Sequence, residues 1–198
     1  MYSVVTSARL IRRVKDREIS YDNWHKKVLS PATTEGDMQM VIKIRPMTES
    51  DVKSVSDLIS AGYRFIAEPD GITDQQLKRL LEERCLPKHV RAIRNRFYCS
   101  VAEVEGRVVG LIALCGHNIE ELWVLPEYHR QGIGTVLFQH AEQSIANSGH
   151  GKVAVLTTGY GKPFYQAMGM EVVDHRKVTI GPLVGRELVL LEKHLQKE

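Results

Sequence analysis

Cysteine is scarce in this sequence, whose 198 residues include only Cys85, Cys99 and Cys115. The three thiols stand too far apart for the close Cys/His pairs of a zinc site, and they do not form the disulfide framework of a small secreted protein. We therefore expect no metal centre in this chain. A reducing, cytoplasmic compartment is the location that fits this cysteine usage best.

A long hydrophobic run and a strong excess of charge are also missing. The longest apolar run, Val108 to Cys115, is far shorter than the roughly 18 residues that a membrane-spanning helix needs. The 27 basic and 24 acidic side chains leave a formal net charge of +3, which lacks the basic footprint of a nucleic-acid-binding protein. We expect a soluble protein with no membrane span and no nucleic-acid partner.

The remaining composition is that of a folded domain. Hydrophobic residues make up 43% of the chain, and 15 glycines and 7 prolines are too few for a low-complexity sequence. Residues 1–40 are mildly basic, and we expect them to form an N-terminal extension, either a mobile or loosely docked tail, which we favour, or a basic amphipathic helix. Residues 41–198 are expected to form a single domain.

Hydrophobic periodicity predicts a mixed α/β domain with the element order β-α-α-β-β-β-α-β-α-β-β. Val55, Leu58 and Ile59 are predicted to form the buried face of the first helix, and Pro87 is predicted to end the second. The predicted strands cover residues 41–45, 98–104, 108–114, 119–125, 152–157, 171–180 and 187–191, and the predicted helices begin near residues 48, 73, 133 and 163.

The segment from Leu122 to Thr135 combines a strand, a glycine-containing turn and a helix N-terminus. Such a turn binds anions, because the first N–H groups of a helix have no partner within it and the helix dipole adds positive charge. A dinucleotide-binding turn would need a third glycine where Leu137 stands. A P-loop would need a hydroxyl residue after Gly-Lys, where the chain has Pro163. The turn is therefore predicted to bind a pyrophosphate other than that of NAD or ATP.

Two motifs resemble those of the GCN5-related N-acetyltransferases, abbreviated GNAT. Residues 126–134, Pro-Glu-Tyr-His-Arg-Gln-Gly-Ile-Gly, look like the family's pyrophosphate loop, Arg/Gln-x-x-Gly-x-Gly/Ala, with His129 in place of the first Arg or Gln. Residues 164–170 look like its late Phe-Tyr-x-x-x-Gly-Phe segment, with Met170 in place of the last Phe. The predicted element order also matches this family. The resemblance implies the acyl-CoA N-acyltransferase fold and acetyl-CoA as co-substrate.

The resemblance also assigns residues to the cofactor. Main-chain groups on the strand before the loop would bind the pantetheine arm and polarise the acetyl carbonyl, and the loop and first helical turn would bind the diphosphate. The predicted cofactor-binding residues are Leu122, Trp123, Val124, His129, Arg130, Gln131, Gly132, Ile133, Gly134 and Thr135.

Acetyl transfer to an amine needs a proton donor for the departing thiolate and a base for the amine. By resemblance, Tyr165 is the candidate donor. Glu120 and Glu121 are the nearest acids, and because neighbouring residues of a strand face opposite sides, only one of them should face the cleft. We expect Glu120 to do so, since it alternates with Leu122 and Val124, unless a β-bulge reverses the order.

The acceptor is predicted to be a primary amine, favouring a small metabolite. In this family, groups near residues 59–84 and 177–186 contact the acceptor, and neither stretch carries a marked acidic cluster for a basic peptide. The alternatives are a protein N-terminal or lysine acetyltransferase and a non-catalytic CoA-binding sensor. A homodimer is an open expectation.

Overall fold

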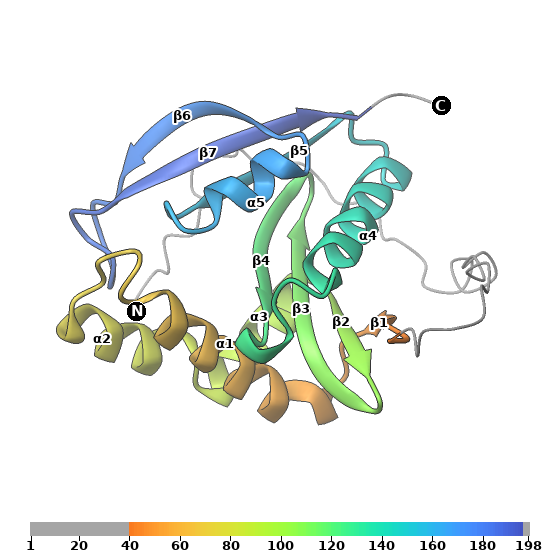
Figure 1. The fold of residues 1–198 in the computed structure, drawn as a ribbon, viewed down its shortest axis with the longest axis horizontal. Helices are drawn as coiled ribbons and strands as arrows, with labels where there is room; N and C mark the ends of the chain where they lie inside the picture. Colours follow the sequence, from red (N-terminus) through yellow and green to blue (C-terminus); the bar gives the residue numbers. More distant parts are fainter. Residues whose placement is uncertain (1–39, 196–198) are drawn as a thin grey trace.

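The computed structural model describes residues 40–195, so the predicted extension lies outside the described residues apart from Met40. The strands within residues 40–195 form one seven-stranded sheet in the order β1-β2-β3-β4-β5-β7-β6 (Figure 1). Neighbouring strands are antiparallel except for β4 and β5. The strands are β1 (Lys43–Pro46), β2 (Tyr98–Val104), β3 (Arg107–Cys115), β4 (Asn118–Val124), β5 (Lys152–Thr157), β6 (Glu171–Lys177) and β7 (Glu187–His194).

The helices confirm the predicted order with one correction. Pro87 follows the end of α2 as predicted, but it also opens a further helix, α3, because a proline at the first helical position loses no hydrogen bond. The chain thus places three helices, not two, between β1 and β2. Within residues 40–195, no helix has both the length and the apolar character needed to cross a bilayer. The helices are α1 (Val52–Ile66), α2 (Asp74–Arg84), α3 (Pro87–Arg96), α4 (Ile133–Asn147) and α5 (Lys162–Ala167).

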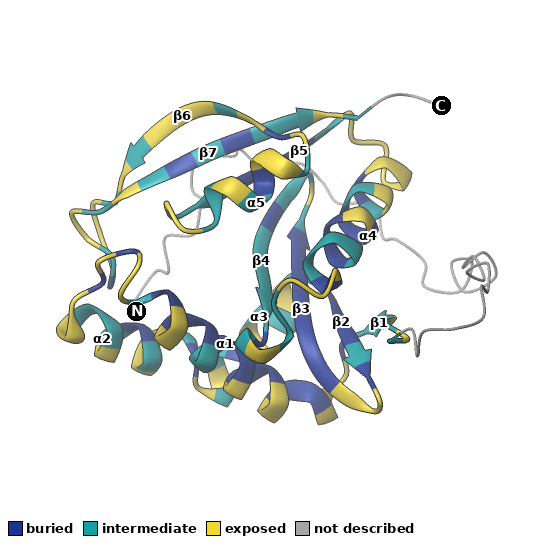
Figure 2. Ribbon diagram, in the orientation of Figure 1, coloured by how far each residue is buried: buried dark blue, intermediate teal, exposed yellow. Residues whose placement is uncertain are grey.

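The interior strand β3 is buried on both faces of the sheet, whereas β6 at the edge is largely exposed (Figure 2). On one face Gly110 lies against Leu137 of α4. On the other face, one strand further along, Trp123 of β4 packs against Gly62 of α1. The sheet is therefore covered by helices on both sides, and its two faces have different neighbours.

A charged cluster fixes the start of α1. The guanidinium of Arg45 donates to both carboxylate oxygens of Asp51, at 2.7 and 2.8 Å, and to Glu103 at 2.8 Å. The backbone N–H of Thr48 also donates to Asp51, at 2.7 Å. Hydrogen bonds from Arg45 and Thr48 lower the pKa of the Asp51 carboxyl to about 2. Arg45 thus links β1, β2 and the buried Asp51 carboxylate at the start of α1.

Asp51 makes stability depend on acid. Because its folded-state pKa is lowered from 3.8 to about 2, its contribution is complete above about pH 4 and is lost as the pH falls toward 2. A shift of this size corresponds to about 2 kcal/mol of unfolding free energy. We therefore expect the parent to have a higher free energy of unfolding than Asp51→Asn at pH 5, and this difference to shrink as the pH falls to 2, as measured by denaturant unfolding. A difference in unfolding free energy that stays constant across this pH range would contradict the lowered pKa of Asp51.

Candidate active site

A β-bulge interrupts β4 where the candidate acids lie. Glu121 pairs with Ala113 of β3, but the next pairing joins Ile119 to Leu114, so Glu120 is the extra residue. Beyond the bulge, Leu122 and Val124 lie on the α4 face of the sheet, while Glu121 and Trp123 lie on the α1 face. The bulge thus shifts the alternation on which the sequence prediction for Glu120 rested.

The strands β4 and β5 part immediately after this point. Their parallel pairing is limited to Asn118 with Ala154 and Ile119 with Val155. Beyond these pairs, residues 120–124 of β4 and residues 156–157 of β5 line the walls of a cleft with a volume of about 1020 Å³. In a regular sheet the facing main-chain groups of both strands would bond to each other. Here they border the cleft and can bond to an extended ligand.

The glycine-containing loop lies at one end of this cleft. Arg130 and Gly132 have positive φ values of 64° and 83°, and α4 starts directly afterwards. His129 Nε2 lies 3.0 Å from the carbonyl oxygen of Val124, and Gln131 donates to the carbonyl of Glu127 at 3.0 Å. The His129 contact ties the loop to the end of β4, and the Gln131 bond closes the loop on itself. The N–H groups at the start of α4, which have no helical partner, can therefore receive an anion at the cleft.

Most of the predicted cofactor-binding residues line this cleft. Gln131 does not, because its side chain bonds back to Glu127, and Ile133 is buried in the core with only its main chain left to serve a ligand. The predicted residues that line the cleft are Leu122, Trp123, Val124, His129, Arg130, Gly132, Gly134 and Thr135.

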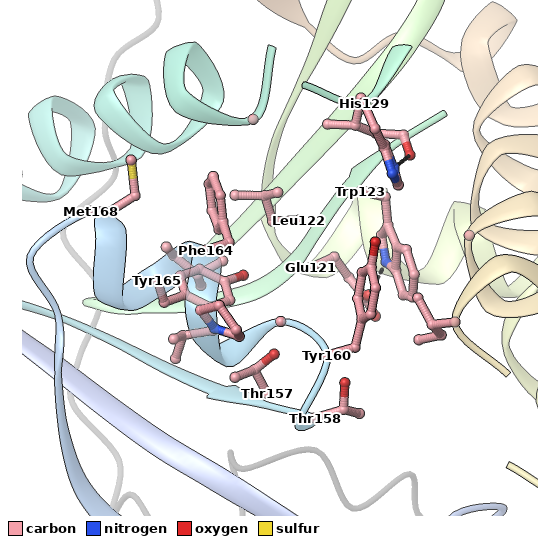
Figure 3. Close-up of a pocket in the computed structure, with 18 of the residues that line it drawn as sticks. Glu121, Leu122, Trp123, His129, Thr157, Thr158, Tyr160, Phe164, Tyr165 and Met168 are labelled. Carbon is pink, nitrogen blue, oxygen red and sulfur yellow. Dashed lines mark hydrogen bonds between the residues drawn. The ribbon is translucent and has the colours of Figure 1, made fainter. Parts of the chain in front are cut away.

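Glu121 is held in the cleft by Trp123. The indole Nε1 donates to a carboxylate oxygen of Glu121 at 2.6 Å (Figure 3). The centroid of the indole ring lies 4.7 Å from that of Tyr63 on α1. Burial raises the pKa of Glu121, while the charge of Arg84 and the indole hydrogen bond oppose that rise. A carboxylate with a raised pKa is a better base for an ammonium group than an exposed one.

Glu120 also lines the cleft, so both acids border it, and the alternation from which Glu120 alone was expected there does not hold. The physical reason is the bulge, since a strand with an extra residue no longer alternates regularly across its two faces. Glu121 is the better defined of the two, because its partner and its face of the sheet are fixed.

Tyr165 lies on α5 at the opposite wall of the cleft (Figure 3). Its ring packs 5.1 Å from Phe164 and 6.2 Å from Phe138 of α4, measured between ring centroids. Burial, with a smaller contribution from the charge of Glu121, raises the pKa of the phenol. The hydroxyl therefore stays protonated at neutral pH and can donate a proton into the cleft.

Two further cleft residues were not predicted individually. Tyr160 stands between β5 and α5, where its backbone N–H donates to Asp70 at 2.8 Å and its ring meets Phe65 edge-on at 5.9 Å. Arg84, at the end of α2, contributes a guanidinium to the lining. The sequence signal for Tyr160 is the pair of glycines that flank it. The sequence signal for Arg84 is its position at the end of residues 59–84, the stretch expected to contact an acceptor.

Comparison with known families decides the assignment. The family model described as the acetyltransferase (GNAT) domain matches residues 68–182, more than half of the chain. The chain belongs to the GNAT family. A curated relative, an uncharacterised N-acetyltransferase of Chlorobaculum tepidum, is 29% identical over 100 residues, which are 48% of this chain and 61% of the relative. The chain thus matches less than two thirds of that relative's length.

Solved structures confirm the GNAT fold. A GCN5-related N-acetyltransferase from Rhodopseudomonas palustris aligns with a TM-score of 0.73 at 20% identity, over 81% of this chain and all of the other. The PaiA N-acetyltransferase of Thermoplasma acidophilum, solved with coenzyme A, aligns with a TM-score of 0.66 at 19% identity, over 79% of this chain and all of the other. YncA of Salmonella typhimurium, solved with acetyl-CoA, has a TM-score of 0.58 at 14% identity, over 79% and 95% of the two chains.

The packing of Trp123 on Gly62 gives a test of the cleft wall. A β-carbon at position 62 would lie 2.7 Å from Cζ3 of the indole and closer still to Cε3, so Gly62→Ala must displace the ring. In a Trp24→Phe background, which leaves Trp123 as the single tryptophan, we expect a changed emission maximum and near-ultraviolet circular dichroism. Gly151→Ala is the control, because a β-carbon there meets no atom within 4 Å. An unchanged spectrum in Gly62→Ala would contradict this packing.

Proposed function

We propose that this GNAT protein transfers the acetyl group of acetyl-CoA directly to a primary amine, with a small molecule as the acceptor. The observation that carries the proposal is the parting of β4 from β5, which opens main-chain groups toward a cleft that ends at the anion-binding start of α4. Coenzyme A has the matching shape, with an extended pantetheine arm attached to a diphosphate. Two structural neighbours, PaiA and YncA, were solved with coenzyme A and acetyl-CoA, which supports the same ligand here.

The cofactor is proposed to lie along β4. Main-chain N–H groups at residues 130–135 would bind the diphosphate, since that turn presents backbone donors and the positive end of the α4 dipole. The amide groups of the pantetheine arm would bond to the open edge of β4 at residues 122–124. The thioester would then lie between the wall of Tyr165 and the wall of Glu121.

The two titratable groups have complementary roles in the proposed transfer. Glu121 removes the proton from the acceptor's ammonium, and the neutral nitrogen attacks the thioester carbonyl. A main-chain N–H of β4 stabilises the oxyanion. The C–N bond forms, the C–S bond breaks, Tyr165 supplies a proton to the departing thiolate, and the second proton lost by the nitrogen restores the phenol of Tyr165. No covalent enzyme intermediate is needed.

A small acceptor is proposed because of the charges in the cleft. Of the described residues that line it, only Glu120 and Glu121 are acidic, and both lie on β4 rather than in a cluster of acids at a rim. A lysine-rich peptide would need such a cluster along its path. Incubation with acetyl-CoA and a panel of amines and peptides, with free thiol and acetylated product both measured, tests the proposal. Acetylation of no amine or peptide would contradict it.

Tyr165→Phe tests the proton donor. Removing the phenol should lower kcat by about 100-fold, the lower range for general acid catalysis, and leave the dissociation constant for CoA unchanged. Tyr98→Phe is the matched control, since Tyr98 is a half-buried tyrosine on β2 outside the cleft. The two variants should be compared by steady-state kinetics and calorimetry. A Tyr165→Phe enzyme with parental kcat would rule the phenol out as donor.

Glu121→Gln tests the base. Because burial raises the pKa of Glu121 above its usual 4.5, the carboxylate form is lost as the pH falls through that raised value. The parent's kcat/KM should fall on the acidic side along with this protonation. Glu121→Gln should lower kcat/KM by about 100-fold, and its pH profile should lack the fall on the acidic side. Glu120→Gln is the matched comparison, and a loss confined to that variant would move the role to Glu120.

A further inference from the structure

One cation in the cleft wall has no hydrogen-bond or ion-pair partner in the described part of the chain. Arg84 lines the cleft and is half-buried, and among residues 40–195 its guanidinium makes no hydrogen bond or ion pair. A guanidinium has five N–H donors and no acceptor, and when shielded from water it is normally bonded to a carboxylate, phosphate or carbonyl. The donors of Arg84 are therefore available to a ligand.

The backbone that carries Arg84 is firmly placed. Arg84 is the last residue of α2, and the next residue, Cys85, is buried, with its carbonyl accepting a hydrogen bond from the Ser56 hydroxyl of α1. The Cys85 thiol in turn lies 3.7 Å from the carbonyl oxygen of Leu80. The end of α2 is thus tied to the helix that forms the cleft wall. A charged group on a fixed backbone position is suited to select a ligand.

Arg84 and Glu121 occupy the same side of the cleft. Glu121 lies on the α1 face of β4, and the charge of Arg84 lowers its pKa against the effect of burial. The two nevertheless form no ion pair, because the Glu121 carboxylate bonds to Trp123 instead. Two separate, opposite charges in a largely apolar cleft are the complement of a molecule that carries both an ammonium and a carboxylate group.

We propose that the acceptor is an amino-acid-type molecule, in which Arg84 binds the carboxylate while the amine is acetylated beside Glu121. This inference rests on the proposed acetyl transfer and adds the acceptor's second charge to it. The amine nitrogen forms the new C–N bond and the carboxylate is unchanged, so the products are an N-acetylated acid and CoA. The cofactor's phosphates are a poorer match for Arg84, because the anion-binding loop begins beyond the far end of β4.

Matched pairs of acceptors test this proposal. Each L-amino acid is paired with its α-amide, and β-alanine is paired with propylamine, so that members differ mainly in the carboxylate. In the parent, kcat/KM for the carboxylated member should exceed that for its partner by about 10- to 100-fold, the range for a charge-assisted bidentate bond. Arg84→Met should abolish this preference while leaving kcat/KM for the partners without a carboxylate unaffected. Arg84→Lys should keep part of it, because charge remains but the planar fork is lost.

Lys78→Met is the control, since Lys78 is an exposed cation on the same helix that lies outside the cleft. It should keep the parental preference. Equal or better acetylation of the partners without a carboxylate by the parent would overturn the proposal. So would an Arg84→Met variant whose KM for acetyl-CoA rises equally with every acceptor, because that would assign Arg84 to the cofactor.

Thermal unfolding separates failure of this inference from failure of the proposed function. If CoA raises the parent's Tm and amines without a carboxylate are acetylated, the proposed function holds, and amino acids should raise the Tm further, with Arg84→Met removing that increment. Absence of both this increment and amino-acid acetylation would overturn the acceptor class alone. If CoA and acetyl-CoA give neither a Tm increase nor turnover, the proposed function fails and this inference fails with it.

Discussion

The parting of β4 from β5 is the constraint on which the rest of the cleft depends. Strands in the middle of a sheet normally satisfy each other's main-chain groups, yet here the pairing ends after two residue pairs. Buried N–H and C=O groups without partners cost free energy, and a ligand or water that bonds to them recovers it. The bulge at Glu120 and the start of α4 border the same opening. One interruption of the sheet thus provides both the cleft and the main-chain groups that can bind a ligand in it.

The bulge also determines which side chains of β4 lie on each face of the sheet. Leu122 and Val124 belong to the face covered by α4, whereas Glu121 and Trp123 belong to the face covered by α1. Burial raises the pKa of both Glu121 and Tyr165, with opposite chemical consequences. The carboxylate becomes a stronger base, and the phenol stays protonated. In the proposed reaction, one group can therefore receive a proton and the other can release one at the same pH.

Much of the fold could be read from the sequence, because hydrophobic periodicity marks elements that bury one face. The strands at 98–104 and 152–157 have the predicted limits, and the buried face of α1 at Val55, Leu58 and Ile59 is as expected. The sequence does not predict the third helix, because a proline such as Pro87 is typical both of a helix end and of the first position of a new helix.

The site was less predictable than the fold, for two physical reasons. The loop before α4 is formed by consecutive residues, so its glycines predict it. A bulge depends on the register between β4 and β3, which the sequence of β4 alone does not specify. Arg84 is one of several charged residues on α2, and nothing local separates it from Lys78 or Arg79. Only the tertiary packing of α2 beside α1 brings it to the cleft.

Hydrogen–deuterium exchange with and without saturating CoA tests the central claim most directly. If CoA occupies the opening between β4 and β5, the amides of residues 120–124 and 130–135 should exchange more slowly in its presence, with the edge strand β6 unaffected. Protection confined to other parts of the chain, or none at a CoA concentration that saturates a measured binding curve, would contradict the account.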